Sequence, residues 1–371
     1  MSFTRPCLAR LAQAAGLLLP VFLLISGCQP AVVPAQPDPT STPAADIMPQ
    51  TITQAPDSAS GPGFQPPAGD GAPLRFTFPT PGSAPISLWR PPLYDTPWAL
   101  GPYDHFYFSR PIAADEVNWP LADYRYGGTF FADTVHTGID ITAPRNTPVL
   151  AAGNGRVISA GYGLFYGNND PNDPYGLAVV IRHDFGYQGQ HLYTVYGHMD
   201  KILATEGQDV KTGDVLGLVG TTGQTTGPHL HFEVRIERNS YYATLNPELW
   251  LAPPQGWGVL VGRVENTNGS LLEKQEVYVR NLETNQKWTV RSYGSQALNN
   301  DPYYQENVVL SDLPAGQYSV EIDYQDEDPQ TLQIEIHPGG VSYFTFRGKL
   351  YFDTSLPPTP SVAGLIGNEQ P

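Results

Sequence analysis

Short runs of β-forming residues, each closed by turn residues, limit most strongly what this chain can fold into. Four such runs lie in the middle of the sequence, at 177–181, 192–196, 215–219 and 231–236. The last run alternates, with Phe232, Val234 and Ile236 on one face. Turn signals such as Asn154-Gly155 separate the runs. The pattern predicts an all-β domain over 121–250, built as an antiparallel sheet with short connections.

Glycine and proline support this expectation. The chain of 371 residues holds 37 glycines and 38 prolines, and these residues cost about 1 and 3 kcal/mol in helix interiors. A long-helix bundle or a coiled coil is therefore excluded. The length also favours two folded domains over one, because a domain usually takes roughly 100–200 residues.

A second β unit is expected at 257–350. Its strand-like runs lie at 259–264, 277–279, 288–290, 318–322 and 332–336. The stretch Leu313–Val320, with the sequence LPAGQYSV, resembles the carboxypeptidase-regulatory-like or CnaB-like β-sandwiches. The resemblance implies a small β-sandwich that serves as a spacer or binding accessory. The β unit at 257–350 contains one histidine, His337, and no catalytic cluster.

The N-terminus reads as a secretory signal over residues 1–27. Basic residues precede a short apolar stretch that is too short for a comfortable membrane span of about 20 residues. An uncleaved anchor is the alternative. The run Ile25–Cys28 resembles the lipobox of bacterial lipoproteins, which implies lipidation of Cys28. The protein would then be extracytoplasmic and lipid-anchored to a bacterial membrane, in the periplasm or at the cell surface. The other cysteine, Cys7, would be removed with the signal.

The segments between the signal and the first β domain are rich in proline. Residues 28–73 carry many prolines and no lysine or arginine, which predicts a disordered tether. Residues 74–120 add many aromatic residues and are interpreted as an irregular wrap on the next domain. The end of the chain, 351–371, is expected to be disordered. The net charge of −16 argues against a nucleic-acid partner, which would be met by a basic patch.

The candidate chemistry lies in the histidines. His229 and His231 are two apart, so in a strand both imidazoles project from one face. Such a pair indicates a metal or catalytic site, although a structural role is the alternative for the pair alone. His136 and Asp140 lie in a loop that leads into a strand and could converge on that pair. Two histidines and one carboxylate are typical of a catalytic zinc site, which keeps a position open for water or substrate.

Together with His198 at the end of another strand, these residues resemble the LytM/lysostaphin-type zinc metallopeptidases, peptidase family M23. The segments 207–213 and 226–233 are also similar to that family, and the likeness covers about 125–240. It implies that His136, Asp140 and His231 bind Zn²⁺, and that His198 and His229 are catalytic residues whose separate roles stay open. It further implies a membrane-tethered zinc endopeptidase that hydrolyses peptide bonds in bacterial peptidoglycan.

Other interpretations stay open. One is a non-catalytic LytM-like protein that binds cell wall or activates another wall hydrolase. Another is a surface lipoprotein in which the sandwich is the functional part. The stretch 161–174 is longer than a minimal hairpin and either shapes substrate access or elaborates the surface. Four of its residues superficially suggest calcium ligands: Asn168, Asp170, Asn172 and Asp173.

Overall fold

A computed structural model describes residues 92–112, 120–129, 134–294, 298–325 and 328–358. The predicted signal peptide and tether, with Cys28, lie outside the described residues, as do parts of the predicted wrap and tail. Every described helix is a 3₁₀ turn of three residues: η1 (Ala122–Tyr124), η2 (Tyr241–Ala243), η3 (Pro247–Leu249) and η4 (Gly348–Leu350). Over the same residues, no helix has the length and apolar character needed to cross a bilayer.

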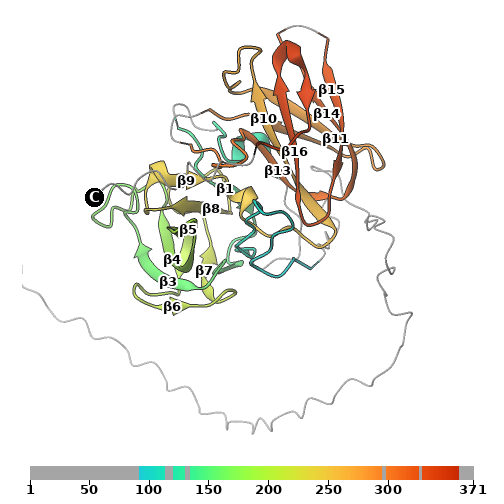
Figure 1. Ribbon diagram of the computed structural model, residues 1–371. Coiled ribbons are helices and arrows are strands. Elements are labelled where there is room, and N and C mark those ends of the chain that lie inside the picture. Colours follow the sequence, from blue (N-terminus) through green and yellow to red (C-terminus); the bar gives the residue numbers. More distant parts are fainter. Residues whose placement is uncertain (1–91, 113–119, 130–133, 295–297, 326–327, 359–371) are drawn as a thin grey trace, which may run out of the picture. The chain divides into compact units, whose positions relative to one another are not determined.

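The first β unit is a nine-stranded antiparallel sheet (Figure 1). Its strands are β1 (Ile139–Thr142), β2 (Pro148–Leu150), β3 (Gly155–Gly161), β4 (Leu177–Tyr187), β5 (Gln190–Ile202), β6 (Asp209–Val210), β7 (Val215–Val219), β8 (His229–Ile236) and β9 (Thr244–Leu245). The main order is β1-β8-β5-β4-β3-β6, while β7 pairs with β2 and β5, and β9 pairs with β8. The four predicted β runs all lie in strands, which confirms the predicted antiparallel β-sheet.

Strand β8 is buried along nearly its whole length and sets the two sides of this sheet. Leu230, Phe232 and Val234 are fully buried in the hydrophobic core. The alternate residues of the strand are polar and are also buried: His229, His231, Glu233 and Arg235. Because side chains alternate along a strand, one face of β8 completes a core and the other carries the candidate chemistry.

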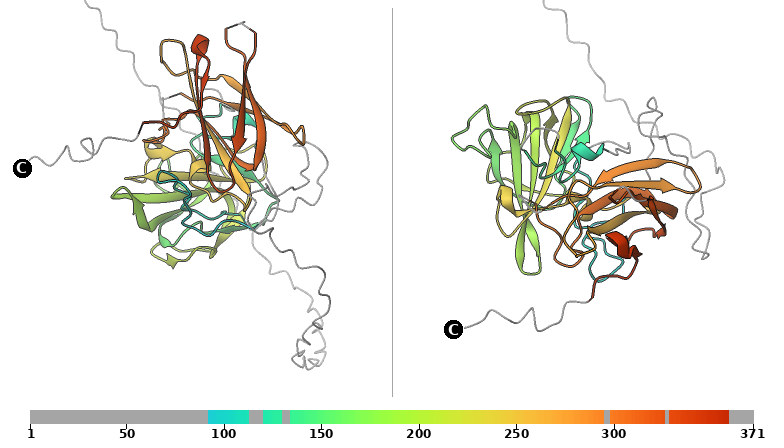
Figure 2. Two further views of the ribbon diagram at one scale, coloured as in Figure 1. Left: turned by 45° about the vertical axis from the view of Figure 1, so that its right-hand side comes forward. Right: turned by 90° about the horizontal axis from the view of Figure 1, so that it is seen from above.

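The second β unit is a sandwich of two four-stranded sheets, coloured from orange to red in Figure 2. One sheet has the order β13-β10-β16-β17 and the other β12-β11-β14-β15. The bounds are β10 (Trp257–Glu265), β11 (Glu276–Asn281), β12 (Lys287–Arg291), β13 (Val308–Pro314), β14 (Gly316–Ile322), β15 (Gln330–Ile336), β16 (Val341–Arg347) and β17 (Phe352–Asp353). The predicted β-sandwich is confirmed. Strands β10 and β16 pair in parallel, while the other neighbours are antiparallel.

The sheet that contains β10 is apolar on both faces. Leu260 and Val264 belong to the interior of the sandwich. Val259 and Val261, on the opposite face, belong to the same buried cluster as Trp250 and the core of the first sheet. Burial of apolar surface is the main favourable term in folding. The sandwich therefore shares a continuous core with the first β unit.

The aromatic segment before the first sheet contributes to that shared core. Phe106 and Phe108 are fully buried. The backbone of Phe108 forms a bridge with Leu251, and Ile112 forms one with Val149. Over residues 92–112, this segment therefore packs along the shared core as irregular chain with isolated bridges.

Candidate metal centre and cleft

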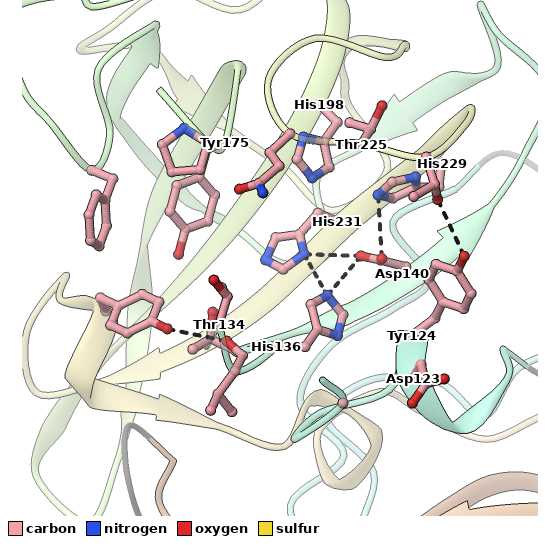
Figure 3. Close-up of a pocket in the computed structure, with 18 of the residues that line it drawn as sticks. Asp123, Tyr124, Thr134, His136, Asp140, Tyr175, His198, Thr225, His229 and His231 are labelled. Carbon is pink, nitrogen blue, oxygen red and sulfur yellow. Dashed lines mark hydrogen bonds and ion pairs between the residues drawn. The ribbon is translucent and has the colours of Figure 1, made fainter. Parts of the chain in front are cut away.

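Three residues bring their ligand atoms together where β1 pairs with β8 (Figure 3). Asp140 on β1 lies directly opposite His231 on β8 in the strand register. His136 precedes β1, and its Nε2 lies 2.9 Å from Asp140 Oδ1 and 2.9 Å from His231 Nδ1. His231 Nδ1 lies 3.0 Å from Asp140 Oδ1. Among the described residues, this is the one group of three potential metal ligands so close together.

The segment between His136 and Asp140 must run tightly against β8. A Cβ atom added at Gly138 would lie 2.4 Å from the carbonyl oxygen of Phe232. No side chain fits there without moving backbone, because real Cβ atoms do not approach backbone oxygen so closely. The glycine therefore lets the loop place His136 beside the register pair of Asp140 and His231.

In His136 and His231, the hydrogen bond of the ring nitrogen that faces away from the convergence point shows which nitrogen carries the hydrogen. His136 Nδ1 lies 2.9 Å from the carbonyl oxygen of Arg125, which can only accept, so Nδ1 carries the hydrogen. His231 Nε2 lies 3.1 Å from a Glu233 carboxylate oxygen, so the same reasoning leaves Nδ1 as its free lone pair. Two nitrogen lone pairs and one carboxylate oxygen therefore converge on one point. This donor set fits a divalent cation with nitrogen and oxygen ligands.

A proton is the other cation that can relieve this convergence of acceptors. Burial lowers the pKa of His231, but hydrogen bonds to Asp140 and Glu233 outweigh it and raise the pKa to about 9. Burial likewise opposes ionisation of Asp140, but His136 and His231 hold its pKa well below the usual value. The site is therefore built to hold positive charge.

Two further imidazoles flank the three ligands (Figure 3). The rings of His198 and His229 lie 4.8 Å apart between centroids. The Nδ1 of His198 donates to Thr222 O at 2.9 Å, and that of His229 donates to Gly227 O at 2.8 Å. Each ring therefore keeps an acceptor at Nε2. Burial is the main cause that lowers the pKa of both, to about 3 for His198. The lowered pKa therefore favours the neutral form of both rings.

A bulge in β5 directs His198 to this site. Tyr196 lies opposite Phe232 on the core side, and Gly197 lies opposite His231 on the site side. Strict alternation would return His198 to the core side. The pairing of β5 with β4 shifts at this point, and His198 has a φ of 60°, in the left-handed region. Bulges and such backbone strain commonly re-aim side chains at functional sites.

A buried polar network supports the β8 side of the site. Glu233 accepts hydrogen bonds from Tyr175 Oη at 2.7 Å and from Arg235 Nε at 2.7 Å. Thr137 Oγ1 donates to the same carboxylate. Burial opposes the charge on Glu233, but Arg235 and His231 lower its pKa to about 2. None of these residues belongs to the predicted site, although the period of two that links His229 to His231 continues through Glu233 and Arg235.

The site opens into a cleft of about 320 Å³. Besides the five site residues, its lining includes Tyr124, Phe165, Tyr166, Tyr175, Tyr241 and the 224–226 segment. Phe165 and Tyr166 come from the 161–174 stretch and remain 48% and 59% exposed. The ring of Phe165 meets Tyr241 edge-on at 5.4 Å. The long loop therefore forms one wall of the cleft rather than a remote surface elaboration.

Asp173 holds this wall in place. Its fully buried carboxylate accepts hydrogen bonds from the backbone nitrogens of Phe165, Tyr166 and Tyr175. Asp170 Oδ1 accepts from the backbone and side-chain nitrogens of Asn172. These carboxylates therefore bind nitrogens of the loop itself.

Comparison with known proteins places this site in a family. Residues 134–243 match the family model described as Peptidase family M23. The chain carries a peptidase family M23 domain. All five site residues lie within the matched range. The structure brings His136, Asp140, His198, His229 and His231 together as the resemblance implied, while their individual roles stay predictions.

Several relatives match about a third of the chain or less. The DD-carboxypeptidase/endopeptidase Mpg of Neisseria meningitidis is 38% identical over 126 residues, which are 34% of this chain and 26% of the relative. The peptidoglycan DD-endopeptidase ShyA of Vibrio cholerae is 41% identical over 102 residues, 27% of this chain and 20% of the relative. The uncharacterized lipoprotein YgeR of Escherichia coli is 38% identical over 125 residues, 34% of this chain and 42% of the relative.

The chain spans between 20% and 42% of the lengths of these relatives. Among solved structures, the catalytic domain of lysostaphin from Staphylococcus simulans aligns with 33% of this chain and 86% of its own length. Its sequence identity is 28% and its TM-score is 0.29.

Proposed function

We propose that this protein is a zinc metalloendopeptidase that hydrolyses peptide bonds in bacterial peptidoglycan. The observation that carries the proposal is the convergence of three acceptor atoms, from His136, Asp140 and His231, beside a cleft in an M23 domain. The substrate class is supported by relatives whose names describe peptidoglycan DD-endopeptidases. Zinc is the expected cation because two imidazoles and one carboxylate form a three-ligand set typical of catalytic zinc.

The bound cation and the two flanking histidines would have different roles in hydrolysis. When bound, the cation supplies the Lewis acidity that activates water and polarises a peptide carbonyl. His198 and His229 face the same space, and the lowered pKa of each ring favours its neutral form, in which Nε2 carries no hydrogen. The Nε2 of His229 lies 3.5 Å from Asp140 Oδ2. Such a nitrogen can accept the proton that the attacking water loses and deliver it to the departing amine. The ring that has taken this proton can donate a hydrogen bond from its Nε2–H to the developing oxyanion until the proton passes to the amine.

The cleft fits an extended peptide substrate. Its floor holds the candidate ligands, and its walls come from the 161–174 loop, the 224–226 segment and η1. Tyr124 Oη and Thr226 Oγ1 lie 3.3 Å apart. These hydroxyls and the exposed edges of Phe165 and Tyr166 provide mixed polar and apolar contacts for a peptide.

Digestion of purified cell walls tests the proposal. Wild-type protein should bind about one zinc per chain and release peptide fragments identifiable by mass spectrometry, and a chelator should stop the release. His231→Ala should lose both properties, whereas replacement of the exposed His191 by Ala should lose neither. Zinc binding without hydrolysis of any wall type would instead support the non-catalytic binder or activator. Stoichiometric zinc in His231→Ala would contradict the ligand assignment.

We also propose that the mature protein is extracytoplasmic and held at a membrane by lipid on Cys28. The lipobox-like run Ile25–Cys28 supports this, as does the lipoprotein named among the relatives. Metabolic labelling with a radioactive fatty acid should mark the wild type and leave Cys28→Ala unlabelled. Equal labelling of both proteins would overturn the assignment of Cys28.

A further inference from the structure

Glu248 is a buried carboxylate that the proposed chemistry does not use. It lies in η3 and is fully buried. Its Oε2 accepts hydrogen bonds from Arg125 Nη1 at 2.5 Å, from Ser311 N at 2.8 Å and from Ser311 Oγ at 2.8 Å. Burying a charge is costly unless it is paired and hydrogen-bonded. The carboxylate is therefore a fixed junction between two parts of the chain that are distant in sequence.

One arm of this junction leads to a candidate metal ligand. Arg125 is nearly buried, and its Nε also donates to Pro120 O at 3.0 Å. The carbonyl oxygen of the same residue accepts the Nδ1 hydrogen of His136 at 2.9 Å. The backbone of His136 is also bound to the two glycines just after Arg125. Gly127 N donates to His136 O, and His136 N donates to Gly128 O. Anchoring the Arg125 side chain thus fixes the carbonyl that orients the His136 ring.

The other arm leads into the sandwich. Ser311 lies on β13, whose sheet shares its outer apolar face with the core of the first β unit. Two further contacts from the sandwich unit reach the same short segment before His136. Arg291 on β12 forms an ion pair with Asp123 in η1, and Asn299 N donates to Tyr126 Oη at 3.0 Å. The segment that orients His136 is therefore held by the sandwich unit at three points.

We propose that the sandwich is a working part of the metal centre, and that Ser311, Glu248 and Arg125 are positioning residues for His136. The inference rests on the proposed metal site and extends it. A hydrogen bond to the second nitrogen of a ligating histidine fixes its tautomer and ring orientation. Here that bond depends on a side chain from the sandwich. The expected spacer or accessory domain would then contribute to metal affinity as well as to packing.

Glu248→Gln in the full chain tests this link. It keeps the shape of the side chain but removes the charge that holds Arg125. Zinc affinity should therefore fall, but by less than the roughly 10–100-fold that follows loss of a direct hydrogen-bond partner of a metal ligand. Ser311→Ala should give a smaller fall, and Ser311→Thr, which keeps the hydroxyl, should restore affinity. Zinc affinity is measured by competition with a chromophoric chelator. The absorption spectrum of Co²⁺-substituted protein should change in Glu248→Gln.

Two controls separate positioning from general destabilisation. Val320→Ala removes buried volume inside the sandwich, so it should lower the melting temperature and leave zinc affinity unchanged. Nitrogen-15 NMR of the zinc-free protein should show the Nδ1–H tautomer of His136 in the wild type and a mixture in Glu248→Gln. If Glu248→Gln keeps wild-type zinc affinity and the wild-type tautomer, the inference is wrong. Failure of wild-type protein to bind zinc would instead overturn the proposed metal site. The NMR result would still test whether Glu248 controls the tautomer of His136.

Discussion

Strands β8 and β10 are both buried on their two faces, but they bury different chemistry. Strand β10 presents Val259 and Val261 to one core and Leu260 and Val264 to another. Strand β8 buries an apolar face and, on the other side, two imidazoles, a carboxylate and a guanidinium. Apolar groups need only volume, whereas buried polar groups need partners with defined geometry. Changes in β10 should therefore affect stability, and changes on the polar face of β8 should affect chemistry first.

The sharpest test of this contrast concerns the two histidines outside the ligand set. His198→Ala and His229→Ala should each keep zinc, because neither ring supplies one of the three converging atoms. Each should lower the rate of wall hydrolysis by about 10²–10⁴-fold, the usual contribution of an acid–base group. Zinc content and single-turnover rates measure the two properties separately. Loss of zinc in His229→Ala would mean that the ligand set is larger than three.

Glu233→Gln should affect both chemistry and stability. It leaves Arg235 buried without its charge partner, which should cost about 3–5 kcal/mol of unfolding free energy. It also weakens the hydrogen bond that orients His231, so zinc affinity should fall about 10–100-fold. Urea unfolding of zinc-free protein and zinc competition measure these effects. The exposed Glu237 provides the control, because Glu237→Gln should change neither value.

The apolar strand should respond in the opposite way. Leu260 is fully buried inside the sandwich, so Leu260→Ala should lower the unfolding free energy by about 2–5 kcal/mol. Zinc affinity and the hydrolysis rate should stay at wild-type values below the unfolding transition. A large fall in activity at a temperature where the variant is folded would show that the two strands do not divide stability and chemistry in this way.

The sequence predicted the part of the site that follows simple periodicity. His229 and His231 share a face because strands repeat every two residues, and Asp140 was found because its carboxylate completes a metal set. His198 could not be placed by periodicity, because a bulge in β5 reverses the side on which it lies. The resemblance to a family found it instead.

The supporting residues were harder to predict for a physical reason. Glu233 continues the period of two from His231, so its burial could have been inferred once that face was known to be covered. Glu248 and Ser311 are 63 residues apart in the chain, and Arg125 is 123 residues from Glu248. Their contacts depend on how the sandwich packs on the first sheet. Single residues of ordinary type carry no local pattern that reveals such packing.

A second buried carboxylate sharpens the comparison with Glu233. Burial is the main cause that raises the pKa of Glu306 to about 8, and repulsion from Asp301 adds to it. Tyr293 Oη and the backbone nitrogen of Asp301 donate to this group. The folded protein therefore keeps a proton up to about pH 8, whereas the unfolded chain releases it near the ordinary pKa of about 4.3. Between these values unfolding releases a proton, so stability falls as pH rises.

This pH dependence is directly measurable. Urea unfolding of the wild type at several pH values should show a loss of up to about 1.4 kcal/mol per pH unit between about pH 5 and 8 from this group. Glu306→Gln should remove that part of the slope, because its amide cannot ionise. Identical slopes in the two proteins would show that Glu306 is already ionised in the folded state at neutral pH.

The smallest expected effect lies at the wall of the cleft. Phe165 is half exposed and contacts Tyr241, while its backbone is held by Asp173. Phe165→Ala should therefore leave the loop, the zinc affinity and kcat unchanged and remove only an apolar contact to bound substrate. A lost contact of about 1 kcal/mol corresponds to a rise in KM of about fivefold. Leu203, 50% exposed and outside the cleft, gives the control, since Leu203→Ala should leave KM unchanged. A fall in kcat with unchanged KM would instead place Phe165 in contact with the reacting group. Catalysis would then depend on the loop as well as on the polar face of β8.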